Sequence, residues 1–541
     1  MNVLDTTTTT ARAAAAVPPT APLLIGCGGG SAAEPPPPAA IGFKAHNLAR
    51  MAALGLPVPP AFVLGTGWCA QPQALTAEVW QPALAALEQA TGARFGDARR
   101  PLLLSVRSGA AVSMPGMMET LLNIGLTETS LPGLLRSTGN PRLAWDAYRR
   151  LVAGYGEVVL AVRAAAFEAD LRQIAGPRDE RDLDFIELRQ LTRLHLATVQ
   201  REAGRPFPQD PRAQLDGAIA AVFASWSAPK ACDYRRLNGL ADDLGTAVTV
   251  QAMVFGNAGG TSGAGVGFTR HPSTGAPEPW VDFLFNAQGE DVVSGRRSAH
   301  GHEELATVAP SVWQALQQAM QRLERAFGDM QDFEFTVENG RLWLLQTRPG
   351  KRTVQARARI ALDLLDEGLI GADEARRRTR GIDADALALE RLVNDDGQAA
   401  APLARAVSAA HGVAIGEVAL DEARARQRQA AGAPVLLVRQ DAETSDIVAL
   451  DIACGLLTAH GARTSHAAVV ARQLGKVCLV GCETLQIDLP RRMLRLGDAE
   501  IAEGELLTLD GHDGAVYRGA ARTVREVPAG LLARLQALRS R

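Results

Sequence analysis

Apolar positions recur at different spacings along the chain, and the changes in spacing divide it into regions. Helical spacing dominates residues 78–95 and nearly all of 140–225, where the proline-rich stretch Pro206–Pro211 makes a break. Short apolar runs at Ala61–Gly65 and Leu102–Val106 have the length of buried strands instead. The pattern predicts a mixed α/β (α+β) fold that carries a helical insertion at about 140–225.

The remainder of the chain changes from strands to charged helices and back to strands. Residues 246–350 are rich in strand patterns and glycine, whereas residues 353–394 have the composition of a charged helical connector. Residues 395–520 alternate short β runs with turns and predict a separate β-rich domain, followed by a helix or tail over 521–541. The strands expected in that domain are Pro434–Val438, Gly455–Thr458, Val477–Val480, Glu505–Leu509 and Ala515–Tyr517.

Three segments predict flexibility. Residues 1–40 are biased toward Thr, Ala, Gly and Pro, so we expect a low-complexity, flexible tail that builds little core. Its glycine-rich run Gly26–Gly30 could approach an anion, but it lacks the Gly-Lys-Ser/Thr ending of a P-loop. Segments near 393–405 and 520–525 are candidate hinges, and Asn394–Gln398 in the first of them is polar, contains glycine and lacks apolar anchors.

Composition and charge narrow the class of protein. The chain has 541 residues, more than one ordinary core, and its net charge of −3 gives no reason to expect nucleic acid or a membrane as partner. No apolar run of about 18 residues predicts a transmembrane helix, and Met1–Ala16 lacks the features of a secretory signal. Six scattered cysteines indicate a reducing compartment. We expect a cytoplasmic protein that acts on a small molecule.

A glycine- and serine-rich segment after the second buried strand is the first candidate for chemistry. In Ser105–Thr120 the loop can direct backbone N–H groups at phosphate oxygens, and Arg107 can add a charge-assisted contact. An ordinary surface loop with a salt-bridged arginine would have the same residues. The segment alone does not separate the two interpretations.

Acidic and polar residues gather farther along the chain. Asp332 and Glu334 are two residues apart on an expected strand and therefore point to the same face. Two carboxylates on one face suit Mg²⁺, which completes its shell with water and nucleotide phosphates. The next strand ends in Gln346-Thr347-Arg348, which adds polar groups at the same edge. The solvated face of a hairpin shows the same alternation, so both interpretations stay open.

One histidine has a distinctive setting. In Thr464-Ser465-His466, either hydroxyl residue can cap a helix whose first turn contains His466. Unpaired N–H groups and the positive end of the helix dipole would stabilise a phosphoryl group added to that ring. The geometry suits a histidine nucleophile, although a histidine that only helps to cap a helix remains the alternative.

Together these segments resemble pyruvate phosphate dikinase, from about Gly42 to Tyr517. The resemblance is carried by SVRSGAAVSMPGMMET, QAMVFGNAGGTSGAGVGFTRHPSTG, NAQGEDVV, DMQDFEF, LLQTRPGKRT and TSHAAVVAR. The family implies an ATP-grasp nucleotide-binding domain over 41–352, a connector, and a swivelling phosphohistidine domain over 395–520. Because the family's histidine shuttles between two distant active sites, we expect this domain to move as a unit on the candidate hinges near 393–405 and 520–525. In that family ATP first pyrophosphorylates the histidine, and inorganic phosphate then removes the outer group as pyrophosphate.

The resemblance assigns roles residue by residue. His466 corresponds to the phosphate carrier, Thr464 to a threonine that a regulatory kinase modifies in some members, and Asp332 with Glu334 to the metal site. The implied cofactor is Mg²⁺, and ATP and phosphate are the implied substrates. The residues implied to contact nucleotide or phosphate are Lys44, Arg107, Gly116, Met118, Thr269, Gln288, Glu290, Arg297, Gln346 and Arg348.

Three departures from the family pattern bear on function. In the turn Gly42-Phe43-Lys44-Ala45, Phe and Ala stand where the family has glycines, and Asp282 stands where it has glutamate. Only residues 518–541 follow Tyr517, whereas the family continues into a (β/α)8 barrel that binds pyruvate and phosphoenolpyruvate. We therefore expect the barrel's site to be missing from this chain.

These observations predict an ATP-dependent phosphotransferase that phosphorylates its own His466 and serves an acceptor on a separate polypeptide, such as a barrel protein for phosphoenolpyruvate and pyruvate. The oligomeric state stays open. One alternative is a regulatory or scaffolding relic that binds nucleotide with little turnover, which the altered Gly42–Ala45 turn favours. The other is a kinase for an unrelated small molecule.

Overall fold

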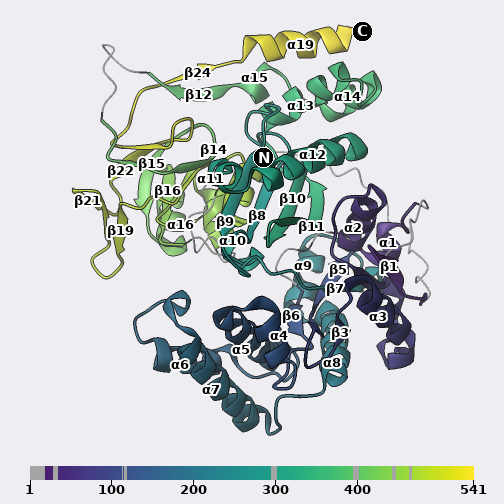
Figure 1. The fold of residues 1–541 in the computed structure, drawn as a ribbon. Coiled ribbons are helices and arrows are strands. Elements are labelled where there is room, and N and C mark those ends of the chain that lie inside the picture. Colours follow the sequence, from purple (N-terminus) through teal and green to yellow (C-terminus); the bar gives the residue numbers. More distant parts are fainter. Residues whose placement is uncertain are drawn as a thin grey trace. The chain divides into compact units, whose positions relative to one another are not determined.

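The chain forms two compact units, and each is described by itself. The computed structural model describes residues 19–27, 34–112, 114, 118–293, 301–393, 401–441, 446–461, 463 and 466–540. The first unit comprises residues 1–254 with 343–346, and the second comprises residues 255–342 with 347–541 (Figure 1). Both combine helices with sheets, which confirms the expected α/β class. The division falls inside the nucleotide-binding domain that was predicted over 41–352.

A five-stranded sheet organises the first unit. Its order is β1-β2-β7-β5-β6, and each neighbouring pair is antiparallel. The central strand β7 is buried along its whole length. The bounds are β1 Leu23–Ile25, β2 Ala61–Leu64, β5 Leu104–Ala110, β6 Thr120–Ile124 and β7 Thr246–Ala252, and a separate pair is formed by β3 Arg94–Phe95 and β4 Pro101–Leu102.

Two sequence-based expectations about this sheet were wrong in detail. Leu23–Ile25 lies in the stretch expected to be a flexible tail, yet it pairs with β2 as an edge strand. An exposed strand edge accepts extended backbone of almost any composition, so a segment poor in core residues can still pair. The strand expected at Leu102–Val106 runs from Leu104 to Ala110 because its pairing with β7 continues through Ser108 and Gly109.

Helices surround this sheet, and those between residues 140 and 225 confirm the helical character predicted there. The break at Pro206–Pro211 separates α7 from α8, where Asp210 accepts from the Arg212 N–H and Pro211 begins the helix. The bounds are α1 Pro38–Ile41, α2 Phe43–Ala53, α3 Ala77–Thr91, α4 Leu131–Thr138, α5 Pro141–Val158, α6 Ala164–Ala175, α7 Phe185–Ala203, α8 Pro211–Ala224 and α9 Pro229–Leu237. No helix in the described ranges is long and apolar enough to cross a membrane.

The second unit begins with a four-stranded sheet in the order β11-β10-β8-β9. The strands are β8 Gly263–Phe268, β9 Trp280–Phe285, β10 Gln331–Glu338 and β11 Arg341–Pro349, whose residues 343–346 count with the first unit. The helices that follow β9 are α10 Gly289–Val293, α11 Glu303–Val308 and α12 Pro310–Phe327. We name this four-stranded sheet the platform sheet.

Residues 246–350 contain the strands β7 to β11, as their strand-rich pattern predicts, but they also contain helix α12, which the sequence analysis did not identify. Its buried side chains are Val312, Leu316, Ala319, Met320 and Leu323, which form one helical stripe. The helical spacing of apolar residues is confined to residues 310–327. Strand-like patterns lie on both sides of it, and the sequence analysis therefore did not identify the helix.

The connector consists of α13 Val354–Asp366, α14 Ala372–Arg378 and α15 Ala384–Leu387, as its charged helical pattern predicts. The end of the chain returns to it: β12 Leu389–Leu392 pairs with β24 Thr523–Glu526 (Figure 1). Leu535 and Leu538 of α19 Ala529–Ser540 pack into the connector core. The hinge expected at 520–525 is therefore wrong in part, because Thr523–Glu526 is a paired strand. Within the other expected hinge, residues 394–400 lie outside the described residues.

The C-terminal domain contains an eight-stranded mixed sheet in the order β13-β23-β22-β15-β16-β17-β18-β14. Every strand expected here is present, with Gly455–Thr458 and Val477–Val480 at the predicted bounds and the others shifted or extended by one residue. The bounds are β13 Ala404–Arg405, β14 Val407–Ala410, β15 Val413–Ala419, β16 Val435–Arg439, β17 Gly455–Thr458, β18 Val477–Val480, β22 Leu506–Asp510 and β23 Ala515–Arg518, with a small sheet of β19 Leu485–Asp488, β20 Met493–Leu496 and β21 Ala499–Ala502. Its helices are α16 Glu422–Ala430, α17 Ile447–Ile452 and α18 His466–Gln473.

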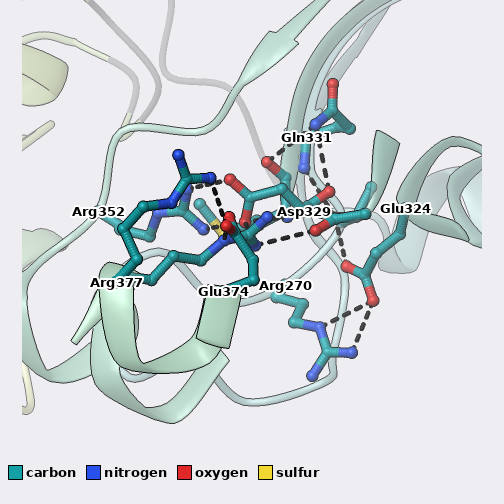
Figure 2. Close-up of polar contacts among 11 residues, drawn as sticks. Arg270, Glu324, Asp329, Gln331, Arg352, Glu374 and Arg377 are labelled. Atoms are coloured by element: carbon teal, nitrogen blue, oxygen red, sulfur yellow. Dashed lines mark hydrogen bonds and ion pairs between the residues drawn. The ribbon is translucent and has the colours of Figure 1, made fainter. Parts of the chain in front are cut away.

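A network of ion pairs joins the platform sheet to α12 and the connector (Figure 2). Arg270, just after β8, donates to Glu324 of α12 at 2.7 Å and to Glu367 after α13 at 2.8 Å, and it lies 3.5 Å from Asp363. Asp329, just before β10, accepts from Arg352 at 2.6 Å. We call this set the connector network; its members are Arg270, Glu324, Asp329, Arg352, Asp363, Glu367, Glu374, Arg377 and Arg378.

Candidate functional site

The first unit brings the altered turn close to the strand that carries Arg107. Gly42 precedes α2 with φ 77°, and a Cβ there would lie 2.0 Å from the carbonyl oxygen of Gly109 on β5. Glycine is therefore required at this point, and it is the glycine that the turn retains. Lys44, in the first turn of α2, is exposed, and Arg107 is half-buried on β5. The structure thus places the two expected phosphate contacts on adjoining elements.

The glycine- and serine-rich loop after β5 is described only in part. Met118 packs against an apolar cluster that contains Ala110, Met114 and Trp226. Gly116, which the sequence assigned to the same phosphate loop, lies outside the described residues. The described part of the loop is therefore held by apolar contacts.

In the second unit, β10 carries the two expected metal ligands. Asp332 is buried and accepts from Arg348 Nε at 2.8 Å, whereas Glu334, two residues along the same face, is half-buried. Burial raises the pKa of Asp332, and the Arg348 guanidinium opposes that rise. Burial also lowers the pKa of Arg348, but Asp332 and Glu334 outweigh it and the pKa is raised. Two carboxylates and one guanidinium leave a group with one net negative charge.

The pairing register shows which further residues share that face. Directly opposite residues of antiparallel strands point to the same side. Asp332 lies opposite Phe268, which lies opposite Trp280, and Glu334 lies opposite Val266, which lies opposite Asp282. One face of the platform sheet therefore carries two rows: Asp332, Phe268 and Trp280 in one, and Glu334, Val266 and Asp282 in the other.

Thr269 is not part of this face. Its N–H donates to the Gln331 carbonyl at 2.9 Å, so it lies beside Gln331 on the opposite side of the sheet from Asp332. Its hydroxyl donates to Glu324 at 2.8 Å and thereby joins the connector network. The structure separates Thr269 from the residues with which the sequence had grouped it.

The remaining expected nucleotide contacts are distributed over β11 and the segment after β9. Gln288 is buried, and its side chain donates to Asn257 at 3.3 Å while its N–H donates to Asp291 at 2.9 Å. Glu290 lies in α10, and Gln346 is a buried residue of β11. Arg297 lies outside the described residues.

His466 is the first residue of α18, as the sequence predicts. Ala467, Ala468 and Ala471 are buried in a cluster with residues of β14, β17 and β18, which fixes this helix on the eight-stranded sheet. The proposed cap and regulatory residue Thr464 lies outside the described residues. The position at a helix start agrees with the electrostatic argument for a phosphorylated ring.

The residue that sequence reasoning missed is Arg463. Its Nε donates to Asp282 Oδ1 at 2.6 Å, another guanidinium nitrogen donates to the Val281 carbonyl at 3.0 Å, and the guanidinium lies 4.3 Å from the centre of the Trp280 ring. Asp282 was noticed only as a departure from the family pattern. An arginine three residues before the expected nucleophile was the available signal, but nothing in the sequence pairs it with a strand 181 positions away.

A second arginine contacts the loop that contains Arg463. Arg472, in the last turn of α18, is buried, donates to the Ala409 carbonyl at 2.7 Å and to the Arg463 carbonyl at 3.0 Å, and lies 5.4 Å from the centre of the Phe268 ring. Burial lowers the pKa of Arg472 to about 10. The start and the end of the α18 segment are thus both held over the same face of the platform sheet.

In comparisons with known proteins, two family models match the regions that contain the platform sheet and α18. Residues 72–303 and 301–368 match the family model "Pyruvate phosphate dikinase, AMP/ATP-binding domain", and residues 432–514 match "PEP-utilising enzyme, mobile domain". The pyruvate, phosphate dikinase of Clostridium symbiosum is 42% identical over 509 residues, which cover 92% of this chain and 58% of that protein. The Rhizobium meliloti enzyme is 41% identical over 505 residues, covering 88% and 56%.

A plant relative has a similar identity and coverage. Pyruvate, phosphate dikinase 2 of Zea mays is 41% identical over 489 residues, which cover 88% of this chain and 55% of that protein. The chain therefore spans a little over half the length of these relatives, and the matched half contains both the platform sheet and α18.

Proposed function

Because the chain belongs to the pyruvate phosphate dikinase family, we propose that it transfers phosphate from ATP to its own His466. The ring nitrogen would attack the β-phosphorus of ATP, the bond from the β-phosphorus to the AMP oxygen would break, and pyrophosphohistidine and AMP would result. Inorganic phosphate would then take the outer phosphoryl group and leave as pyrophosphate. Phosphohistidine would remain as the product of this half-reaction.

The observation that carries the proposal is the position of α18. A helix that begins at His466 lies in the same compact unit as Asp332 and Glu334, and its preceding loop contacts the face on which these carboxylates lie. A nucleophile must reach a bound phosphate to attack it, so this arrangement supports the first step.

In this proposal, the expected binding residues have different roles. Lys44 and Arg107 would contact phosphate, and Gln288, Glu290, Arg297, Gln346 and Arg348 would form the nucleotide site. Asp332 and Glu334 fit Mg²⁺ because it takes few carboxylates and completes its shell with water and phosphate oxygens. When bound, Mg²⁺ would neutralise charge on the phosphates. The contact between Arg348 and Asp332 would hold that carboxylate in place.

We further propose that the final acceptor binds outside the residues described here. The matched regions cover 58% and 56% of two curated relatives, whose names contain pyruvate and phosphate. The acceptor of this chain would accordingly be pyruvate or a compound of the same class.

The deciding experiment uses ATP labelled at the β or the γ phosphorus. Without inorganic phosphate, both labels should appear on the wild-type chain as acid-labile phosphate. After phosphate is added, the γ label should leave as pyrophosphate while the β label stays. Nucleotide binding without either label would support the relic interpretation. A γ label transferred with release of ADP would indicate an ordinary kinase.

A further inference from the structure

The strongest feature outside the expected site is the contact of Arg463. The Arg463 side chain contacts three consecutive residues of β9: the Trp280 ring, the Val281 carbonyl and the Asp282 carboxylate. The Asp282 side chain is 0% exposed and the Arg463 side chain 20%, so the pair is desolvated. We call this the arginine contact.

The arginine contact joins two regions that are far apart in the sequence. Asp282 belongs to the platform sheet, and Arg463 belongs to the loop that leads into α18 of the C-terminal domain. A guanidinium that leaves a buried carboxylate gives up a charge-assisted contact in a poorly solvated site, which is unfavourable. The pair therefore favours the arrangement in which the loop lies on the sheet.

The sheet register shows where this anchoring point lies. Asp282 and Glu334 share one row and one face, separated by Val266 of β8. Two strand spacings place their backbones about 10 Å apart. Arg472 lies over Phe268, in the middle of the neighbouring row that ends at Asp332. The segment from Arg463 to Arg472 is thus anchored at both ends on the face that carries the two carboxylates.

We propose that Arg463 is a positioning residue that holds the His466 loop on the platform sheet during phosphorylation, with Asp282 as its receptor. The inference rests on the proposed function, because it assigns the contact to the step in which His466 is phosphorylated. Arg463 acts through the loop and does not itself touch the reacting atoms. Its loss lowers the fraction of molecules in which His466 is presented to bound ATP.

The test measures single-turnover labelling of His466 from β-labelled ATP, beside the dissociation constant of the nucleotide. Arg463→Met and Asp282→Asn should each slow labelling by about 10- to 100-fold at saturating ATP. Nucleotide affinity should stay at the wild-type value. The double variant should be no slower than the slower single variant, because both changes remove the same contact. Arg463→Lys should recover part of the rate.

The matched control is Arg439→Met. Arg439 also combines an ion pair, with Asp446 at 3.2 Å, and a contact with a carbonyl oxygen, that of Leu420 at 3.0 Å, but both partners lie inside the C-terminal domain. It should label at the wild-type rate. If Arg463→Met fails to fold, the isosteric Asp282→Asn variant still decides the question.

The outcomes separate the two proposals. A wild-type chain that takes no label contradicts the proposed function. A wild-type chain that labels, with Arg463 and Asp282 variants that label equally fast, contradicts only the positioning role. Single effects that multiply in the double variant, or a loss of nucleotide affinity that matches the loss of rate, would also overturn the inference.

Discussion

The connector network and the arginine contact are two junctions on the same sheet, and they are built differently. In the connector network, the single side chain of Arg270 contacts three carboxylates, those of Glu324, Asp363 and Glu367, and other charged residues also have more than one partner. The arginine contact relies on the one guanidinium of Arg463 in the C-terminal domain. A network with shared partners loses little of its geometry when one pair opens, whereas a single desolvated pair is either formed or broken. Under the proposed function, the connector network would be the permanent junction and the arginine contact the reversible one.

This comparison gives the platform sheet a specific role. The connector network holds it to α12 and the connector, and the connector core also includes α19 at the end of the chain. Under the proposed function, the sheet would serve as a fixed surface on which the His466 loop docks and from which it leaves. The following predictions test the two junctions, beginning with the largest expected effect.

His466→Ala should abolish acid-labile labelling from β-labelled ATP, because it removes the proposed nucleophile. Nucleotide binding, measured by equilibrium titration, should remain close to the wild-type value. Label that persists on this variant would show that another residue is phosphorylated. The arginine contact would then not position the nucleophile.

Arg270→Met should lower the free energy of unfolding by about 3–5 kcal/mol, because it removes a buried guanidinium that the half-buried Glu324 and Asp363 share. Urea unfolding followed by circular dichroism measures the change. The labelling rate per folded molecule should stay near that of the wild type, which is the reverse of the pattern expected for Arg463→Met. A slow but fully stable Arg270→Met variant would contradict the division into permanent and reversible junctions.

Glu334→Gln should lower the labelling rate at limiting Mg²⁺ by about 10- to 100-fold, a range typical of residues that support a metal site. The free energy of unfolding should change little because Glu334 is half-buried and adds little apolar contact. Glu338→Gln is the matched control on the same strand and face, where the carboxylate accepts from the Phe255 N–H at 2.9 Å. Equal rates in the two variants would place Glu334 outside the metal site.

Acidification should weaken the region around the arginine contact. Burial lowers the pKa of His271, beside Trp280, to about 3 and that of His411 to about 4, from the ordinary value of 6.5. Folded-state pKa values below the unfolded value mean that stability is full above pH 6.5 and declines as the pH falls toward 4 and 3. The decline is at most about 1.4 kcal/mol per pH unit for each histidine.

The measurement compares urea midpoints at pH 7 and pH 5. The two imidazole rings lie 5.1 Å apart, with His271 next to the platform sheet and His411 in the C-terminal domain, so the acid sensitivity belongs to the reversible junction. The double variant His271→Gln, His411→Gln should show a smaller shift between the two pH values. An unchanged shift would assign the acid sensitivity to other groups.

Much of the local structure could be predicted from the sequence because it depends on neighbours in the chain. The strands Gly455–Thr458 and Val477–Val480 are short apolar runs between turns, and their bounds were predicted correctly. The start of α18 at His466 and the common face of Asp332 and Glu334 also follow from local spacing. The chemistry suggested by these residues led to the family that the comparisons show.

Tertiary structure decided everything that depends on pairing between distant segments. Leu23–Ile25 became a strand because β2 offered it an edge, and Thr269 turned away from Asp332 because antiparallel pairing put it beside Gln331. Arg463 found Asp282 only when the C-terminal domain packed on the platform sheet. Spacing along a chain sets which residues share a face, but the burial that makes an ion pair strong exists only after two faces meet.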